Sequence, residues 1–154
     1  VIMQMTWPGA PTVYYGDEVG VCGWTDPDNR RTYPWGHEDK QMLLFHKEAI
    51  RIHRNSTALC TGSYKMLYTA WGILAYGRFD EKERYTVIVN NTQDTVNVAI
   101  PVCQIGVTDG SRMEQQLMSS SASFTKVPDI YVVTDGYLMI AMPKTSAVIL
   151  KDIG

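Results

Sequence analysis

The residues best suited to chemistry lie in one segment, Gly23 to Trp35. Its centre, residues 26–31, reads DPDNRR and combines carboxylate and amide acceptors with branched guanidinium donors. Sugar hydroxyls need this mixture, and the rings of Trp24, Tyr33 and Trp35 could stack on the apolar face of a pyranose. The same residues allow a simpler interpretation, in which Asp–Arg salt bridges only order the segment. Composition does not decide between the two.

Acidic pairs elsewhere in the front part do not have the arrangement that catalysis requires. Glycoside cleavage needs two carboxylates on rigid elements, roughly 5–10 Å apart. Asp17 and Glu18 are adjacent at a predicted strand end, so they would point to opposite sides. We expect solvated or structurally paired acids at a turn and assign no catalytic residue.

The histidines do not predict a metal site. His46 and His53 are seven residues apart, whereas helical metal-binding pairs use a spacing of four. We therefore expect them to pack in the fold, and His37 has no partner at ligand spacing. There is no Ser-His-Asp arrangement, glycine-rich phosphate loop or CxxC motif, so no metal and no cofactor are expected.

Composition narrows the possible partners. The chain has 154 residues, 45% of them hydrophobic, and a net charge of -2. It has no basic stripe, so we expect no nucleic-acid partner, and no apolar run of about 18 residues that would predict a membrane span. Cys22, Cys60 and Cys103 lack ligand spacing and are expected to be free thiols, which leaves the compartment open and weakly favours the cytoplasm. Because an apolar segment begins at Val1, we expect a piece of a longer protein.

The front part predicts few regular elements. Residues 1–7 have the character of a helix end, which the prolines and glycine of residues 8–11 terminate. Thr12–Tyr15 is β-branched and aromatic and predicts a short buried strand, followed by a loop to about Gly36. From Asp39 or Glu38 to Asn55 the spacing of apolar residues predicts a helix. Its apolar face comprises Met42, Leu43, Phe45, His46, Ala49, Ile50 and His53.

From Ala58 onward, alternation with period two replaces the helical pattern. The predicted strands are residues 73–79, 84–90, 95–101, 137–142 and 146–151, and residues 113–125 form a weakly specified strand or loop. Short alternating strands separated by turn residues indicate an antiparallel sandwich.

The boundary between the two parts falls near residues 55–59, which gives units of 1–56 and 57–154. One strand and one helix each leave an apolar face that nothing in the front part covers. We expect this surface to lean on the sandwich or to mediate self-association with another copy of the chain.

The front segments resemble a known family. Residues 5–18, MTWPGAPTVYYGDE, resemble the eighth strand of the catalytic barrel in α-amylase family glycoside hydrolases. Residues 23–35, GWTDPDNRRTYPW, and the helix at 39–54 resemble the loop and eighth helix that follow, and are most similar to the amylopullulanase and neopullulanase types. Residues 59–150 resemble the β domain after the barrel.

The resemblance implies a mainly β fold, an antiparallel β-sandwich preceded by the last strand-loop-helix unit of a (β/α)8 barrel. It also implies a parent enzyme that cleaves α-glucosidic bonds with retention, using an Asp nucleophile, a Glu acid/base and a second Asp, all on strands before Val1. The chain alone would then be inactive. Asp26 and Arg30 match positions that bind glucose of an α-glucan or maltooligosaccharide in an outer donor-side subsite. Trp24, Tyr33 and Trp35 would line the cleft.

Two other readings stay open. The chain could be a non-catalytic carbohydrate-binding or structural β module with a row of exposed aromatics, for which Trp71, Tyr76, Tyr85 and Tyr131 are candidates, although core packing also explains them. The parent could instead be a transglycosylase. The residues distinguish neither transfer to sugar from transfer to water nor α-1,4 from α-1,6 linkages.

Overall fold

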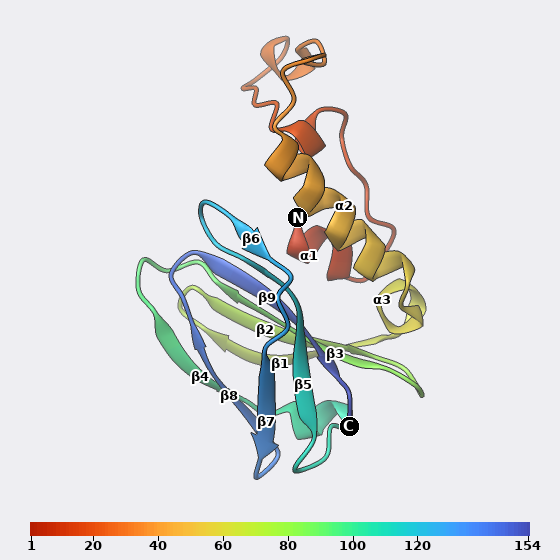
Figure 1. Cartoon of the computed structure of the whole chain (residues 1–154), viewed down its shortest axis with the longest axis vertical. Helices are drawn as coiled ribbons and strands as arrows, with labels where there is room; N and C mark the ends of the chain where they lie inside the picture. Colours follow the sequence, from red (N-terminus) through yellow and green to blue (C-terminus); the bar gives the residue numbers. More distant parts are fainter.

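The computed structural model describes residues 1–154 and has helices at one end and a curved antiparallel β-structure at the other (Figure 1). The helices are α1 (Ile2–Thr6), α2 (Lys40–Arg54) and α3 (Thr57–Thr61), with 3₁₀ turns η1 (Asp17–Val19), η2 (Asp28–Arg30) and η3 (Val102–Ile105). The strands are β1 (Ser63–Ala70), β2 (Ile73–Phe79), β3 (Arg84–Asn90), β4 (Val96–Ile100), β5 (Arg112–Ser119), β6 (Phe124–Thr125), β7 (Ile130–Thr134), β8 (Tyr137–Met142) and β9 (Ser146–Asp152). None of the helices is long and apolar enough to cross a membrane.

Helix α2 has the bounds that the sequence predicts. The Asp39 carboxylate accepts hydrogen bonds from the backbone N–H groups of Gln41 and Met42 at 2.9 and 3.0 Å, which satisfies two of the free donors at a helix N-terminus. The helix ends at Asn55. The prediction of a helix over this segment is confirmed, as is the helical character of residues 1–7 through α1.

The predicted buried strand at Thr12–Tyr15 is wrong. The segment pairs with no strand of the sheet, and Tyr14 and Tyr15 are exposed, with ring centroids 4.8 Å apart. A run of β-branched and aromatic residues forms a stable strand only where neighbouring strands satisfy its backbone donors and acceptors. No such neighbour lies beside these residues.

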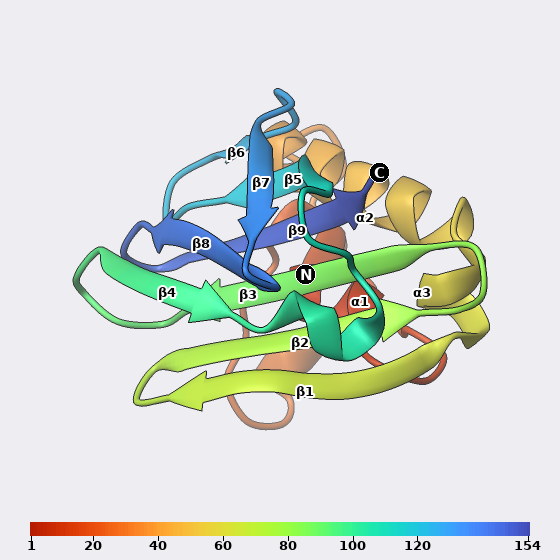
Figure 2. The ribbon, with the colours of Figure 1, turned by 90° about the horizontal axis from the view of Figure 1, so that it is seen from below.

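The strands form the predicted antiparallel sandwich. Their order is β1-β2-β3-β9-β5-β7-β8-β4, with β6 beside β5, and every pairing is antiparallel. Figure 2 shows β4 and β8 crossing over the face of β3 and β9, with the helices behind the opposite face. The path of paired strands therefore folds back on itself and forms a second, smaller layer.

The central strands are buried on both faces. In β9, Val148 and Leu150 belong to the cluster beneath β4 and β8, whereas Ala147 and Ile149 belong to the cluster beneath the helices. Burying a side chain of this size stabilises the fold by about 1.5–3 kcal/mol. This explains why β9 is a nearly continuous apolar run, since both of its faces pack against other elements.

The front part leans on the sandwich, as expected. Side chains of the helices and of β2, β3, β5 and β9 share one buried cluster, which comprises Ile2, Met5, Ala49, Ile52, Ala58, Leu59, Tyr76, Tyr85, Val87, Leu117, Ala147 and Ile149. The Tyr76 hydroxyl lies 2.6 Å from the Thr6 hydroxyl within this cluster, and burial raises the pKa of Tyr76 to about 12. The helix-facing surface of the sheet is therefore a core of its own.

Arg78 joins three elements across this interface. Its side chain is 1% exposed, and its guanidinium donates hydrogen bonds to the carbonyl oxygens of Thr6 at 2.8 Å, Gly62 at 3.1 Å and Ser63 at 3.3 Å. Thr6 is the last residue of α1, Gly62 follows α3, and Ser63 is the first residue of β1. A buried charge is tolerated only when its donors are satisfied, and here backbone oxygens satisfy them.

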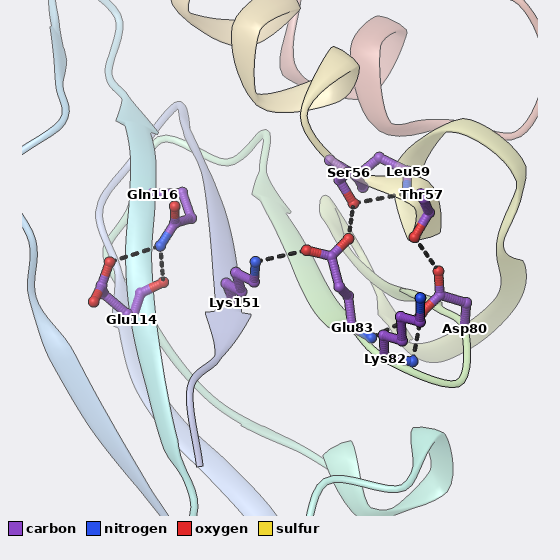
Figure 3. A network of polar contacts seen from close by, with 9 residues as sticks. All are labelled: Ser56, Thr57, Leu59, Asp80, Lys82, Glu83, Glu114, Gln116 and Lys151. Carbon is purple, nitrogen blue, oxygen red and sulfur yellow. Dashed lines mark hydrogen bonds and ion pairs between the residues drawn. The ribbon is translucent and has the colours of Figure 1, made fainter.

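A polar network fixes the start of α3 to the sheet (Figure 3). The Ser56 hydroxyl accepts from the Leu59 N–H at 3.1 Å and donates to Glu83 Oε2 at 2.8 Å, while Lys151 Nζ lies 2.6 Å from Glu83 Oε1. Burial opposes the charge of Glu83, but the hydrogen bonds from Lys151 and Ser56 outweigh it and hold its pKa below the usual range. Thr57 also donates to Asp80. The network joins α3 to the β2–β3 turn and to β9.

Candidate functional site

The segment from Gly20 to Asp39 extends beyond the N-terminal end of α2, at the end of the molecule farthest from the sandwich (orange in Figure 1). Two contacts close it at its base. The Asp39 N–H donates to the Val19 carbonyl at 3.3 Å, and the Tyr15 hydroxyl donates to the Arg31 carbonyl at 2.9 Å. The segment is thus a closed loop whose ends are held beside η1 and the N-terminus of α2.

An inner pair, Asp28 and Arg31, orders the loop. Arg31 Nε donates to Asp28 Oδ1 at 2.8 Å, and the Trp24 N–H donates to Asp28 Oδ2 at 2.9 Å. The hydrogen bond from Arg31, followed by that from Trp24, holds the pKa of Asp28 below its ordinary value. Gly23 packs so tightly here that a Cβ would lie 2.7 Å from Asn29 Cα. For this pair, the structure contains the salt bridge that the ordering interpretation expects.

An outer pair, Asp26 and Arg30, is displayed toward solvent. Arg30 Nε lies 3.4 Å from Asp26 Oδ1, and the two side chains are 62% and 68% exposed, respectively. Exposed ion pairs of this kind contribute only about 0–1 kcal/mol. A polar ligand can therefore replace this contact at small cost. The inner pair is 57% and 43% exposed, but its Asp28 also accepts the Trp24 N–H and so joins two parts of the loop.

The three aromatic residues of the loop are arranged differently from one another. Tyr33 and Trp35 pack together, with ring centroids 4.5 Å apart and planes at 47°. Trp35 and Trp24 are 79% and 84% exposed, and Trp24 belongs to none of the aromatic pairs. Partial burial, with the charges of Glu18 and Glu38, raises the pKa of Tyr33.

A hollow of about 410 Å³ opens beside these residues. It is lined by Tyr14, Tyr15, Asp17, Val21, Gly23, Asn29 and Arg31. None of the five residues selected from the sequence lines it. Asn29 and Arg31 belong to the DPDNRR run, which is the sequence signal for this hollow. Tyr15 has no such signal, because its β-branched and aromatic neighbours predict a buried strand.

The remaining titratable candidates have structural positions. Glu18 accepts a hydrogen bond from the Gly16 N–H at 2.9 Å within a 3₁₀ turn. His46 Nδ1 lies 3.0 Å from the Met42 carbonyl, and His53 Nδ1 lies 2.8 Å from the Met5 carbonyl. Both histidines therefore pack within the fold, as predicted. No group of three or more His, Cys, Asp or Glu residues is placed to hold a metal ion, and the three cysteines are free.

The four aromatic candidates for a binding module do not form an exposed row on the sandwich. Tyr76 and Tyr85 are buried in the core, and Tyr131 is half-buried. Trp71, at the β1–β2 turn, is 96% exposed and is the one candidate that is freely accessible. Core packing accounts for the others.

Known proteins resemble this chain along its whole length, although no family profile matches it. It is 32% identical over 99% of its length to the amylopullulanase of Thermoanaerobacter thermohydrosulfuricus, and covers 10% of that protein. It is 33% identical over 69% of its length to neopullulanase 2 of Thermoactinomyces vulgaris, and covers 19% of that protein. The chain thus spans about a tenth of the length of the amylopullulanase and about a fifth of that of the neopullulanase.

Solved structures agree with these relatives. An Anoxybacillus α-amylase matches 98% of this chain with a TM-score of 0.83 at 24% identity, over 30% of its own length. The native Nostoc punctiforme debranching enzyme matches 97% with a TM-score of 0.75 at 25% identity, over 29% of its length. In sequence and in fold, the chain is thus similar to a part of the enzymes of the α-amylase family. Within that family it corresponds to a C-terminal part, and it is similar over its full length to amylopullulanases.

Proposed function

We propose that the parent protein hydrolyses α-glucans with retention, as an amylase or pullulanase type of enzyme, and that Asp26 and Arg30 contact glucose units at an outer donor-side subsite. The observation that carries the proposal is the exposed Asp26–Arg30 pair on a loop that a separate ion pair orders. Similarity to amylopullulanase over 99% of the chain supports the substrate class.

The chemistry of the loop suits sugar binding without catalysis. The Arg30 guanidinium offers several N–H donors to hydroxyl oxygens, and the Asp26 carboxylate accepts from hydroxyl groups. Trp24, Tyr33 and Trp35 supply ring faces nearby. Glycoside cleavage also needs a positioned nucleophile and acid, which in this proposal come from strands before residue 1. The division at residues 56 and 57 belongs to the same proposal, as does self-association through the front part.

Binding is tested by titrating the ¹⁵N-labelled chain with maltohexaose and following the indole N–H signals of Trp24 and Trp35. We expect saturable shifts, and we expect the double variant D26N/R30Q to weaken binding at least about tenfold, since each lost hydrogen bond to a charged group is worth about 1.5–3 kcal/mol. The control R54Q changes an exposed arginine outside the loop. Unchanged affinity in the double variant would refute the assignment of Asp26 and Arg30.

Catalytic silence is tested by incubating the chain with pullulan and with maltooligosaccharides. We expect no reducing ends above the blank, and any hydrolysis that tracks with the purified chain contradicts the proposal. Shifts confined to the Trp71 indole in the titration would instead support a carbohydrate-binding module, the second candidate. A transglycosylase parent predicts longer oligosaccharide products from the complete enzyme.

A further inference from the structure

A thiol and an imidazole face each other at the junction of α2 and α3. Cys60 Sγ lies 3.7 Å from His53 Nε2 and 3.2 Å from the His53 carbonyl oxygen. The thiol is exposed, so small molecules can reach it. The resting S–H can donate to either neighbour, but only Nε2 can take up the proton.

A second contact sets the tautomer of this imidazole. His53 Nδ1 lies 2.8 Å from the carbonyl oxygen of Met5, which can only accept a hydrogen bond. Nδ1 therefore carries the hydrogen, and in the neutral ring Nε2 presents its lone pair toward Cys60. A nucleophile beside a base that a third group orients is the arrangement that activates a side chain for covalent chemistry.

Cys60 lies two residues before Gly62, whose carbonyl oxygen accepts a hydrogen bond from the buried cation of Arg78. Arg78 donates only to carbonyl oxygens and takes part in none of the salt bridges of the chain. Burial lowers the pKa of its guanidinium. A modification of Cys60 would thus lie next to a segment that this cation joins to α1 and the sheet.

We propose that Cys60 is a reactive thiol that exchanges with low-molecular-weight disulfides, with His53 as its proton acceptor. The Sγ proton passes to His53 Nε2, and the thiolate attacks one sulfur of a disulfide R–S–S–R. The S–S bond breaks, a Cys60–S–S–R bond forms, and the leaving R–S⁻ recovers the proton from His53. Electrons balance, since one disulfide is exchanged for another. The modified residue lies two positions before Gly62, whose carbonyl Arg78 holds.

The chain contains its own controls. Cys22 and Cys103 are also exposed, and neither has an imidazole within hydrogen-bonding distance; Cys22 Sγ is 3.6 Å from the Gly20 carbonyl. The chain is treated with limiting glutathione disulfide, and each cysteine is followed by peptide mass mapping. We expect Cys60 to react about tenfold faster than the other two, a modest effect on the scale of general-base assistance. Equal rates at the three thiols would overturn the proposal without any variant.

The variant H53N isolates the base. An Asn side chain can still donate to the Met5 carbonyl, but it places no ring nitrogen beside Cys60. We expect the rate at Cys60 to fall to that of Cys22, with those of Cys22 and Cys103 unchanged, and H37N, which changes an exposed loop histidine, to have no effect. A Cys60 rate that stays high in H53N would also overturn the proposal.

Discussion

Replacing Arg78 by Met should weaken the attachment of the helices to the sandwich. The change removes three hydrogen bonds from a buried charge to the carbonyls of Thr6, Gly62 and Ser63. Each such bond contributes about 1.5–3 kcal/mol. The variant no longer has to desolvate a buried guanidinium, and this offsets part of the lost hydrogen-bond energy. The Thr6 contact is buried and the other two are part-buried, so we expect a net loss of about 2–4 kcal/mol in the free energy of unfolding.

Urea denaturation measures this loss with two probes. Trp7 packs against Tyr64 and Tyr76 with ring centroids 5.1 Å apart in each case, so tryptophan fluorescence reports on the interface, while circular dichroism at a β-sheet wavelength reports on the sandwich. The control is Arg54→Met, an exposed position of α2 that should change stability by less than about 0.5 kcal/mol. A loss in Arg78→Met no larger than in the control would show that the three carbonyl contacts do not hold the interface.

Two further predictions concern the network and the loop. Because the folded pKa of Glu83 is depressed, its contribution to stability is present above its unfolded pKa and is lost as pH falls through the folded value. In urea titrations from pH 7 to 3, the stability of Glu83→Gln should therefore converge with that of the unchanged chain in acid, whereas the curve of the exposed control Glu81→Gln should run parallel to that of the unchanged chain. Parallel curves for both variants would exclude the network. Gly23→Ala should displace the loop, because its Cβ would meet Asn29 Cα at 2.7 Å. Limited proteolysis should therefore cut the loop of this variant faster than the loop of the exposed control Thr32→Ala. Equal rates of cutting would mean that the loop accommodates the methyl group.

The sequence predicts best those strands that are buried on one face only, or that are buried on both faces. The predicted ranges 73–79, 84–90 and 137–142 coincide with β2, β3 and β8. β8 alternates strictly between buried and exposed residues, which is the clearest sign of a half-buried strand. β2 and β3 are central, and the turn residues at 80–83 mark where one ends and the other begins. For these strands the hydrophobic pattern and the turn residues indicate the same boundaries, so the prediction is confirmed.

The misses have a common physical cause, which is dependence on distant partners. β1 is an edge strand with an irregularity between Met66 and Tyr68, and this shift of register breaks the alternation that would reveal it. α3 has five residues, and its start depends on Ser56, Glu83 and Asp80, residues that the sequence does not place side by side. Thr12–Tyr15 shows the converse, since a strong local preference produces no strand when no partner lies beside it.

At the candidate site, too, part of the arrangement could be predicted from the sequence and part depends on the folded path of the chain. The residue types of the DPDNRR run indicated a polar surface for sugars, but they left open which acid pairs with which arginine. The structure separates the inner pair, Asp28 and Arg31, from the outer pair, Asp26 and Arg30. Spacing alone could not make this distinction, because both pairs lie within one turn of backbone, and the folded path of the loop decides which pair contacts the Trp24 N–H.

This separation bears on how the loop and the sandwich cooperate. The shape of the loop depends on local contacts, chiefly those of Asp28 and Arg31, whereas its direction depends on its base. That base is α2, which His53 joins to α1 through the Met5 carbonyl, and α1 is joined to the sheet by Arg78. Under the proposed function, a sugar must touch this loop and the catalytic strands of the parent at once. Loss of the Arg78 contacts should therefore misdirect an intact loop, and weaken substrate binding in the parent more than maltohexaose binding in this chain.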